Sequence, residues 1–319
     1  MTWDGTKRIE RWLTVYLGVE DTPYTRAVGA IVLVAAVRRA RQPGVKFDEM
    51  LILEGLQGGN KSSALAVMAV CEDWFSDDLP LHASAQRFIE ATKGRWIVEA
   101  GELKGMSKGE KEALKSNLSR QIDRSRAAYG RIPESWPRQF IIIGTTNDKA
   151  FLTDNTGNRR YWPVLVGFID LEKLKADRDQ LWAEAAHLEA SGFSIRLDPT
   201  LYPAAAAEQE KRKVIDPFVD TLREKLGDLE GVLASADAWK IIGLRPEHRK
   251  PADNVRLGDA MRELGWERNP RRLEKGGPPV GAYAKGDAAR SGGGARLSVE
   301  VDEKGQCLRV FDSGEEPPF

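Results

Sequence analysis

The sequence predicts an α/β fold with a parallel sheet at its core, helices before the sheet and a small, mostly helical module after it. Short, wholly apolar runs such as Phe140–Ile143 alternate along the chain with stretches of helical period such as Leu171–Ala190. Strands without polar alternation are typical of a parallel sheet that helices cover on both faces. The length of 319 residues, with 41% hydrophobic and 30% charged residues, fits a folded chain of two domains.

Residues 1–45 are predicted to form an N-terminal helical segment. Its most apolar run, Ala27–Val37, has 11 residues, about half the ~20 residues that a membrane-spanning helix needs. We therefore expect a buried helix and no membrane association. Residues 46–205 are predicted to form the sheet domain. Its expected strands are Met50–Leu53, Trp96–Val98, Phe140–Ile143 and Tyr161–Val166, and its expected helices are Lys61–Cys71, Lys108–Leu118 and Leu171–Ala190.

A second, smaller module is predicted after the sheet domain. Pro199–Ala207 contains two prolines and an alanine run and is interpreted as the connection between domains. Residues 206–285 show three helical patterns and then a segment rich in glycine and proline, an order that fits a winged helix and also a small helical bundle. Residues 286–319 are expected to be a flexible tail with one hairpin at most. The three expected helices are Asp216–Leu226, Gly231–Ile242 and Asn254–Leu264.

Composition and charge argue against several classes of function. Lys plus Arg and Asp plus Glu both number 48, so any binding of nucleic acid would depend on a local basic surface and not on net charge. The two cysteines, Cys71 and Cys307, are far apart and the three histidines are isolated, which argues against a disulfide scaffold and a zinc hydrolase. The N-terminus lacks the pattern of a secretory signal, so a cytoplasmic protein is expected.

A glycine-rich stretch after the first expected strand has the composition of a phosphate-binding loop. Such a loop needs glycines that let backbone N–H groups approach the anion, a helix N-terminus, a lysine for the β- and γ-phosphates and a hydroxyl for Mg²⁺. Asn60 stands where the standard pattern has glycine, but asparagine tolerates a positive φ better than most residues. A surface glycine loop is the alternative. The residues expected at the triphosphate are Gly55, Gly58, Gly59, Asn60, Lys61, Ser62 and Ser63.

Two carboxylates follow the second expected strand, in the stretch Trp96–Glu102. Carboxyl ends of parallel strands meet at one edge of a sheet, so Glu99 and Glu102 are expected to face the phosphate loop. One carboxylate would hold Mg²⁺ together with Ser62, a role we give to Glu99, and the other would polarise the attacking water. The alternative for Glu102 is that it only caps a solvent-facing turn.

Polar side chains also follow the third strand and precede the fourth. Asn147 is placed to reach the γ-phosphate or its water without adding negative charge. The alternative is an Asx-turn that closes the strand. Arg159 and Arg160 enter an apolar strand, where unpaired cations are costly, and a transferring phosphoryl group would be a suitable partner. The alternative is an ion pair with a local acid, Asp148 or Asp154.

Taken together, these motifs resemble the virulence-associated protein E family, a group of phage and prophage P-loop ATPases related to AAA+ proteins and to superfamily 3 helicases. The resemblance extends from about Pro43 to Asp216, over half of the chain. The motifs that carry it, in order, are Gly55–Ser63, Trp96–Leu103, Asp123–Gly130, Pro137-Arg138, Gly144–Asn147, Leu152–Asp154, Gly157–Val164 and Leu181–Ala185. The main departure from the family pattern is Asn60.

The resemblance implies an ATP-dependent DNA helicase or translocase of phage or mobile-element replication, with ATP and Mg²⁺ as cofactors. It implies that Lys61 and Ser62 are the Walker A pair, that Glu99 and Glu102 are the Walker B carboxylates and that Asn147 is the sensor. Arg159 or Arg160 would be an arginine finger that acts on the neighbouring subunit, which implies a homo-oligomeric ring, a hexamer, around single-stranded or forked DNA. Priming would be supplied by a separate primase. Because of Asn60, an ATP-switched DNA-binding or regulatory protein with slow hydrolysis and no unwinding is the alternative.

The second module carries a local excess of positive charge. Residues 240–275 contain ten basic and six acidic side chains. Basic residues on the last expected helix and on the following hairpin are candidates for contacts with DNA phosphates. A solvated charged surface is the alternative for each of them. The candidates are Arg256, Arg262, Arg268, Arg271 and Arg272.

Overall fold

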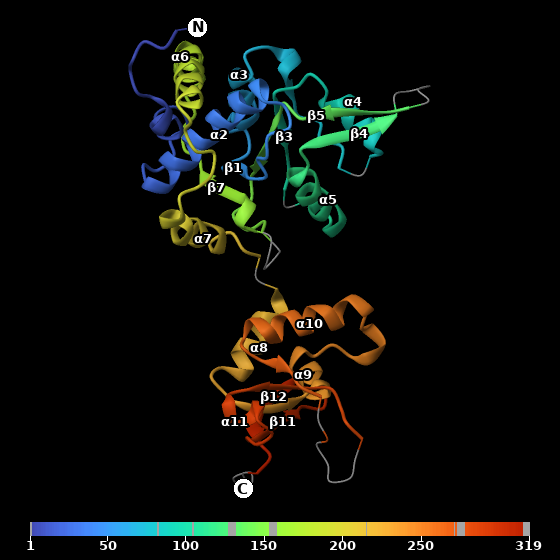
Figure 1. The fold of residues 1–319 in the computed structure, drawn as a ribbon. Helices are drawn as coiled ribbons and strands as arrows, with labels where there is room; N and C mark the ends of the chain where they lie inside the picture. Colours follow the sequence, from blue (N-terminus) through green and yellow to red (C-terminus); the bar gives the residue numbers. More distant parts are fainter. Residues whose placement is uncertain are drawn as a thin grey trace. The chain divides into compact units, whose positions relative to one another are not determined.

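The chain folds into two compact units, Met1–Val214 and Ile215–Phe319. The computed structural model, drawn in Figure 1, describes residues 2–81, 83–103, 105–126, 132–152, 158–214, 216–270, 272 and 278–314. Each unit buries apolar clusters of its own, as expected of two separate folding units.

The first unit is built on a sheet of five parallel strands. These are β1 (Met50–Glu54), β2 (Phe75–Ser76), β3 (Ile97–Ala100), β6 (Ile141–Thr146) and β7 (Tyr161–Leu165). Their order across the sheet is β2-β3-β6-β1-β7, and every neighbouring pair is parallel. The predicted α/β class with a parallel sheet is confirmed. All five strands end at one edge, here called the carboxyl edge, and begin at the opposite amino edge.

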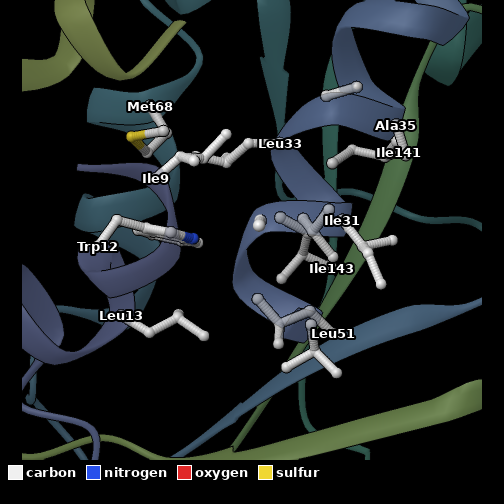
Figure 2. Packing of buried hydrophobic residues seen from close by; sticks show 14 of the residues in the cluster. Ile9, Trp12, Leu13, Ile31, Leu33, Ala35, Leu51, Met68, Ile141 and Ile143 are labelled. Carbon is white, nitrogen blue, oxygen red and sulfur yellow. The ribbon is translucent and has the colours of Figure 1, made fainter. Parts of the chain in front are cut away.

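One face of the sheet is covered by the N-terminal helices and by a long helix that follows the sheet. These are η1 (Ile9–Arg11), α1 (Trp12–Leu17), α2 (Pro23–Arg41), α3 (Lys61–Met68) and α6 (Leu171–Ala190). Leu51 of β1 packs here in one buried cluster with Trp12 and Leu33 (Figure 2). Because α2 contacts α1, α6 and the sheet, its apolar residues surround most of its circumference. In the part of the chain that the structure describes, no helix is both long and apolar enough to cross a membrane.

The opposite face of the sheet is covered by α4 (Ala85–Thr92) and α5 (Lys108–Ser119). Met50 and Ile52 of β1 pack on this side with Phe88 and Leu114, whereas Leu51 belongs to the cluster on the first face. Successive side chains of a strand point to opposite faces. The wholly apolar sequence of β1 therefore follows from burial of both faces, as the sequence predicts.

A two-stranded antiparallel ribbon, β4 (Ile122–Arg126) with β5 (Pro133–Pro137), extends from this unit (Figure 1). Arg138 fixes the ribbon at its base. Its guanidinium is buried and donates to both carboxylate oxygens of Asp123, at 2.6 and 2.7 Å, and to the backbone oxygen of Asn117 at the end of α5. A buried, bidentate ion pair of this kind holds the two segments in one arrangement.

The segment Pro199–Ala207, which we expected to connect two domains, is instead part of the first unit. It forms η4 (Pro199–Leu201) and the start of α7 (Tyr202–Glu210). Alanine is the best helix former, and the two prolines lie at helix starts, where the absent N–H is not needed. The side chain of Gln209 donates to the backbone oxygen of Tyr161 at 2.9 Å, which attaches α7 to β7. The unit boundary therefore follows Val214 and not residue 205.

The second unit combines helices with a five-stranded sheet. Its elements in order are α8 (Pro217–Leu226), β8 (Gly231–Ala234), α9 (Ser235–Ile242), η5 (Pro246–His248), α10 (Pro251–Glu263), β9 (Glu267–Arg268), β10 (Ala282–Lys285), α11 (Asp287–Arg290), β11 (Arg296–Val301) and β12 (Cys307–Asp312). β10 pairs antiparallel with both β8 and β9. The expected helix Gly231–Ile242 begins only at Ser235, because the apolar residues before it pair with β10 and form β8.

The segment 286–319, which we expected to be a flexible tail, contributes two strands to the second sheet. β11 and β12 form the one hairpin that the sequence indicates. β11 also pairs in parallel with β8, through Arg296 with Val232 and Leu297 with Leu233. Leu297 is buried with Trp239 in the core of the unit. Since the hairpin extends an existing sheet and contributes to its core, it is part of the folded unit up to residue 314.

Candidate functional site

The glycine-rich stretch forms a tight loop between β1 and α3, at the carboxyl edge of the sheet. Gly58 and Asn60 both adopt left-handed conformations, with φ of 74° and 60°. Asparagine is among the few non-glycine residues that tolerate this region, so the departure from glycine at Asn60 leaves the loop intact. At Gly55 a Cβ atom would lie 2.6 Å from Cγ2 of Val166. Gly55 is therefore required by the close approach of the segment after β7.

Lys61 is the first residue of α3, and its side chain points back over the loop. Nζ donates to the backbone oxygens of Gly55 at 2.9 Å and Leu56 at 2.8 Å and to Oδ1 of Asn147 at 2.8 Å. These three acceptors match the three protons of an ammonium group. Burial lowers the pKa of Lys61, while the nearby charge of Glu99 raises it. The ammonium thus lies where the glycine-rich loop and the end of β6 meet.

Glu99 on β3 joins this group from a second neighbouring strand. Its Oε1 atom accepts from Ser62 Oγ at 2.8 Å and from Thr145 Oγ1 at 2.5 Å. Its Oε2 atom is buried and has no hydrogen-bond partner among the described residues. A buried carboxylate oxygen without a partner, beside a serine hydroxyl, matches the oxygen donors that Mg²⁺ prefers. Ser62 and Glu99 are therefore suited to hold this ion.

The other expected carboxylate, Glu102, lies outside this contact group. It follows the end of β3, is exposed and has a left-handed backbone with φ of 51°, a conformation that costs energy for a residue other than glycine. No side-chain partner of Glu102 is found in the described part of the chain. Ser63 is also exposed, on the first turn of α3. Lys61, Ser62, Glu99 and Asn147 are thus brought together, and Glu102 is not.

Arg159 and Arg160 lie at the opposite edge of the sheet. They form η3 (Asn158–Arg160), directly before β7, and Tyr161 pairs with Met50 at the start of β1. They therefore lie at the amino edge, whereas the glycine-rich loop follows the end of β1. Within one chain the structure does not bring either arginine to Lys61.

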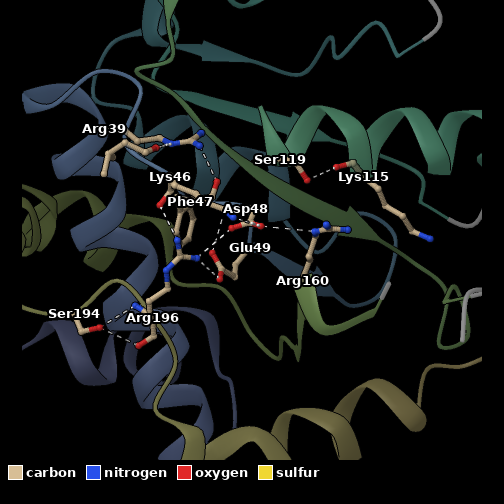
Figure 3. A network of polar contacts seen from close by, with 11 residues as sticks. Arg39, Lys46, Phe47, Asp48, Glu49, Lys115, Ser119, Arg160, Ser194 and Arg196 are labelled. Carbon is tan, nitrogen blue, oxygen red and sulfur yellow. Dashed lines mark hydrogen bonds and ion pairs between the residues drawn. The ribbon is translucent and has the colours of Figure 1, made fainter. Parts of the chain in front are cut away.

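Arg160 lies beside Asp48, an acid that the sequence does not indicate as its partner. Nε of Arg160 lies 3.9 Å from Oδ2 of Asp48, and Nη1 of Arg196 lies 3.1 Å from Oδ1 of the same carboxylate and 2.8 Å from Glu49 (Figure 3). The parallel pairing of β1 and β7 creates this contact. The expected alternative partner Asp154 lies outside the described residues. A cavity of about 560 Å³ opens here, and its charged lining residues are Lys46, Asp48, Glu49, Arg159, Arg160 and Arg196.

Three further residues, Thr145, Glu54 and Arg212, support the site and were not predicted from the sequence. Thr145 binds Glu99, and its signal in the sequence is a hydroxyl at the end of an otherwise apolar strand. Glu54, the last residue of β1, forms a buried ion pair with Arg212, at 2.5 Å between Oε2 and Nε. This pair joins the segment after α7 to the strand that leads into the glycine-rich loop. No local pattern indicates it, because the partners are far apart in the sequence.

The arginines of the second unit that we expected to contact DNA differ in their ion pairs and in their exposure. Arg256 donates to both carboxylate oxygens of Asp216 at 2.8 Å and lies over the ring of Phe218, at 4.2 Å from its centre. Its guanidinium is therefore engaged in holding α10 against the start of α8. Arg262 pairs with Asp259 at 2.6 Å on an exposed surface of α10. Arg268 and Arg272 are exposed, and Arg271 lies outside the described residues.

The model of the virulence-associated protein E-like domain matches residues 1–214, and the chain belongs to this family. Among solved structures, the apo C-terminal region of NrS-1 (residues 305–718) is similar, with a TM-score of 0.53 and 12% sequence identity over 89% of this chain and 77% of that one. A second structure of the same region gives a TM-score of 0.52 and 13% identity over the same shares. At these identities the likeness concerns the fold alone. No curated protein matches the chain.

Proposed function

We propose that the first unit is a P-loop NTPase that binds and hydrolyses ATP with Mg²⁺. The observation that carries the proposal is the convergence of Lys61, Ser62, Glu99 and Asn147 at the carboxyl edge, from α3, β3 and the end of β6. A lysine, a hydroxyl, a carboxylate and an amide around a glycine-rich loop are the groups that a nucleoside triphosphate and its metal ion require.

Each side chain has a defined task in this proposal. Lys61 leaves its carbonyl acceptors and binds the β- and γ-phosphates, while the backbone N–H groups at the start of α3 face the anion. Ser62 and Glu99 would hold Mg²⁺, which would supply positive charge to neutralise the phosphate oxygens. Asn147 orients the attacking water or the γ-phosphate. Thr145 fixes the rotamer of Glu99 through its hydrogen bond.

The arginines at the amino edge complete the proposed site in trans. Arg159 and Arg160 are remote from the phosphate loop of their own chain, and they line a cavity in which basic side chains outnumber acids. A phosphoryl group bound by a neighbouring subunit is a suitable partner for this surface. We accordingly propose a homo-oligomeric ring, a hexamer, with ATP at the subunit interfaces.

The second unit is proposed to be a winged-helix-like module that binds DNA. The proposal is supported by the element order α8-β8-α9-α10-β9-β10, with β10 between β8 and β9, because three helices followed by a hairpin are expected of a winged helix. Arg262, Arg268 and Arg272 are the exposed candidates for phosphate contacts, whereas Arg256 is engaged within the unit. In the first unit, Arg124 and Arg126 are exposed along the projecting ribbon and are suited to contact nucleic-acid phosphates.

Together the units would form an ATP-dependent DNA helicase or translocase that serves the replication of a phage or mobile element. The protein is expected to hydrolyse ATP faster in the presence of single-stranded DNA and to separate the strands of a fork in a Mg²⁺- and ATP-dependent manner. Steady-state ATPase measurements and strand displacement with a labelled fork check both. ATP binding and DNA binding without strand displacement would support the alternative, an ATP-switched regulatory protein.

Glu99→Gln is expected to reduce kcat for ATP hydrolysis by about 100-fold or more, because the neutral amide removes the charge that holds Mg²⁺. ATP binding measured in EDTA should change little, because Lys61 and the loop remain. The matched control is Glu102→Gln, which is expected to have a small effect on kcat, since Glu102 lies outside the contact group. A loss in Glu102→Gln as large as that in Glu99→Gln would contradict the assignment of the metal site to Glu99.

A further inference from the structure

Two apolar side chains beside the phosphate loop are almost fully solvent-exposed. Leu56 has an exposed fraction of 85% and Phe168 of 83%, the highest values among the large hydrophobic residues that the structure describes. Leu56 belongs to the loop itself, and Phe168 follows β7. Since burying an apolar side chain is favourable, two such residues next to a ligand site point to a ligand with an apolar surface.

The segment that carries Phe168 lies against the loop that carries Leu56. The backbone N–H of Val166 donates to the oxygen of Glu54 at 2.8 Å, and a Cβ atom on Gly55 would lie 2.6 Å from Cγ2 of Val166. Leu56 is the next residue after Gly55, and Phe168 is two residues after Val166. The two exposed side chains therefore flank one contact at the carboxyl ends of β1 and β7.

The backbone around Phe168 is held firmly although its side chain is free. Gly167 donates to the oxygen of Leu17 and Asp170 to that of Tyr16, both at 2.9 Å. A Cβ atom on Gly18 would lie 2.9 Å from the backbone nitrogen of Phe168, so the N-terminal segment and this turn touch backbone to backbone. An aromatic ring presented on a fixed backbone loses little entropy when a flat ligand stacks on it.

The sheet order sets the direction in which a bound nucleotide extends. Its reacting phosphate must face Glu99 and Asn147, which come from β3 and the end of β6, on one side of β1. β7 lies on the other side of β1. The nucleoside end, which points away from the reacting phosphate, therefore extends across β1 toward the turn after β7 that carries Phe168.

We propose that Phe168 and Leu56 form the nucleobase subsite, in which the base stacks on the Phe168 ring and Leu56 covers its edge. This inference rests on the proposed binding of a nucleoside triphosphate at Lys61. Neither side chain carries a hydrogen-bonding group, and every base has an aromatic face, so the contact does not select one base. The ligand class is a nucleoside triphosphate, without selection for one base.

The test measures the affinity of wild type and Phe168→Ala for ATP, GTP and inorganic tripolyphosphate by titration calorimetry. Phe168→Ala is expected to weaken ATP and GTP alike by about tenfold and to leave tripolyphosphate unchanged, because only the nucleotides carry a base. Phe168→Trp should restore nucleotide affinity. Leu165→Ala is the matched control, since it removes another apolar side chain with an exposed fraction of 56% from the end of β7.

Other outcomes separate the failure of this subsite from the failure of the proposed function. If Phe168→Ala lowers the affinity for all three ligands equally, or for none of them, the base does not stack on Phe168. Binding of the ligands by wild type would in that case still support the triphosphate site at Lys61. If wild type binds none of the ligands, the proposed function fails and the subsite with it. If Phe168→Ala alters the mass of the assembly in light scattering but not nucleotide affinity, Phe168 is a subunit contact and the proposal is overturned.

Discussion

Lys61→Ala is expected to lower kcat/KM for ATP hydrolysis by about 100-fold or more. Lys61 is buried at the start of α3, and its ammonium bonds to two loop carbonyls and to Asn147. In the proposed complex this charge faces the β- and γ-phosphates in a site with little water, where removal of one such donor costs a factor of about 10² to 10³. Calorimetric titration with ATP should show a matching loss of affinity.

The control for Lys61→Ala is Lys175→Ala, which removes an exposed lysine from α6 in the same unit. This control should leave ATP affinity and turnover unchanged. Circular dichroism and thermal unfolding establish whether both variants fold, because Lys61 also ties the loop to the end of β6. A folded Lys61→Ala protein with wild-type affinity for ATP would show that the triphosphate does not bind at this loop.

The affinity for ATP is expected to depend on pH through the same lysine. Burial lowers the pKa of Lys61, and only the protonated ammonium attracts phosphate. As the pH rises, ATP affinity should therefore fall earlier than the pKa of an ordinary, exposed lysine would predict. The Lys61→Ala protein should lack this part of the pH profile, which separates the titration of Lys61 from the titration of other groups.

Strands β1, β3, β6 and β7 of the parallel sheet could be predicted because burial on both faces gives short, wholly apolar runs in the sequence. Met50–Leu53 of β1 and Ile141–Ile143 of β6 are apolar at successive positions, which a strand with one solvent-exposed face would not be. The order β2-β3-β6-β1-β7 is not a local property and had to come from the structure. β2 has only two residues, too few for any pattern to reveal.

The second unit shows where local patterns fail. The residues of β8 form a short apolar run with alanine that reads as the beginning of α9, and only the pairing of Leu233 with Tyr283 makes them a strand. In the tail, glycines and charged residues indicate flexibility, yet β11 gains its stability from the edge of β8. Both errors arise because strand formation depends on a partner distant in the sequence.

Much of the candidate site could be predicted from the sequence because its residues follow strands. Lys61, Glu99 and Asn147 each stand at or after the carboxyl end of a strand, and parallel strands bring these ends together. Thr145 and Arg212 could not be predicted, because their roles depend on strand register and on contacts between residues far apart in the sequence. Arg256 was expected to face DNA, and its pairing with Asp216 depends on the packing of α10 against α8.

The proposed trans arrangement of the arginines makes a strong prediction. Replacing both Arg159 and Arg160 with alanine is expected to lower kcat by about 10³-fold, the low end for an arginine finger, while the affinity for ATP changes little. The reason is that a finger contacts the phosphoryl group mainly in the transition state. Single replacements of each arginine then identify which of the two carries the effect. Arg196→Ala serves as a control that removes a guanidinium from the same cavity.

Mixing two inactive proteins tests whether the arginines act across a subunit interface. The Lys61→Ala protein retains its arginines, and the double arginine variant retains its phosphate loop. In a head-to-tail ring assembled from equal amounts of the two, about a quarter of the interfaces combine an intact loop with intact arginines from the neighbour. Turnover of the mixture should therefore recover to about a quarter of the wild-type value, whereas each variant alone remains inactive.

A purely structural role for these arginines predicts the opposite result, no recovery in the mixture. If Arg160 only neutralised Asp48, which lies 3.9 Å from it and also binds Arg196, its loss would destabilise the amino edge of its own subunit and a partner could not correct it. No recovery in mixtures that light scattering shows to contain both variants in one assembly would therefore assign Arg159 and Arg160 to the fold. Recovery requires that the loop of one subunit and the arginines of the next meet at the same phosphate.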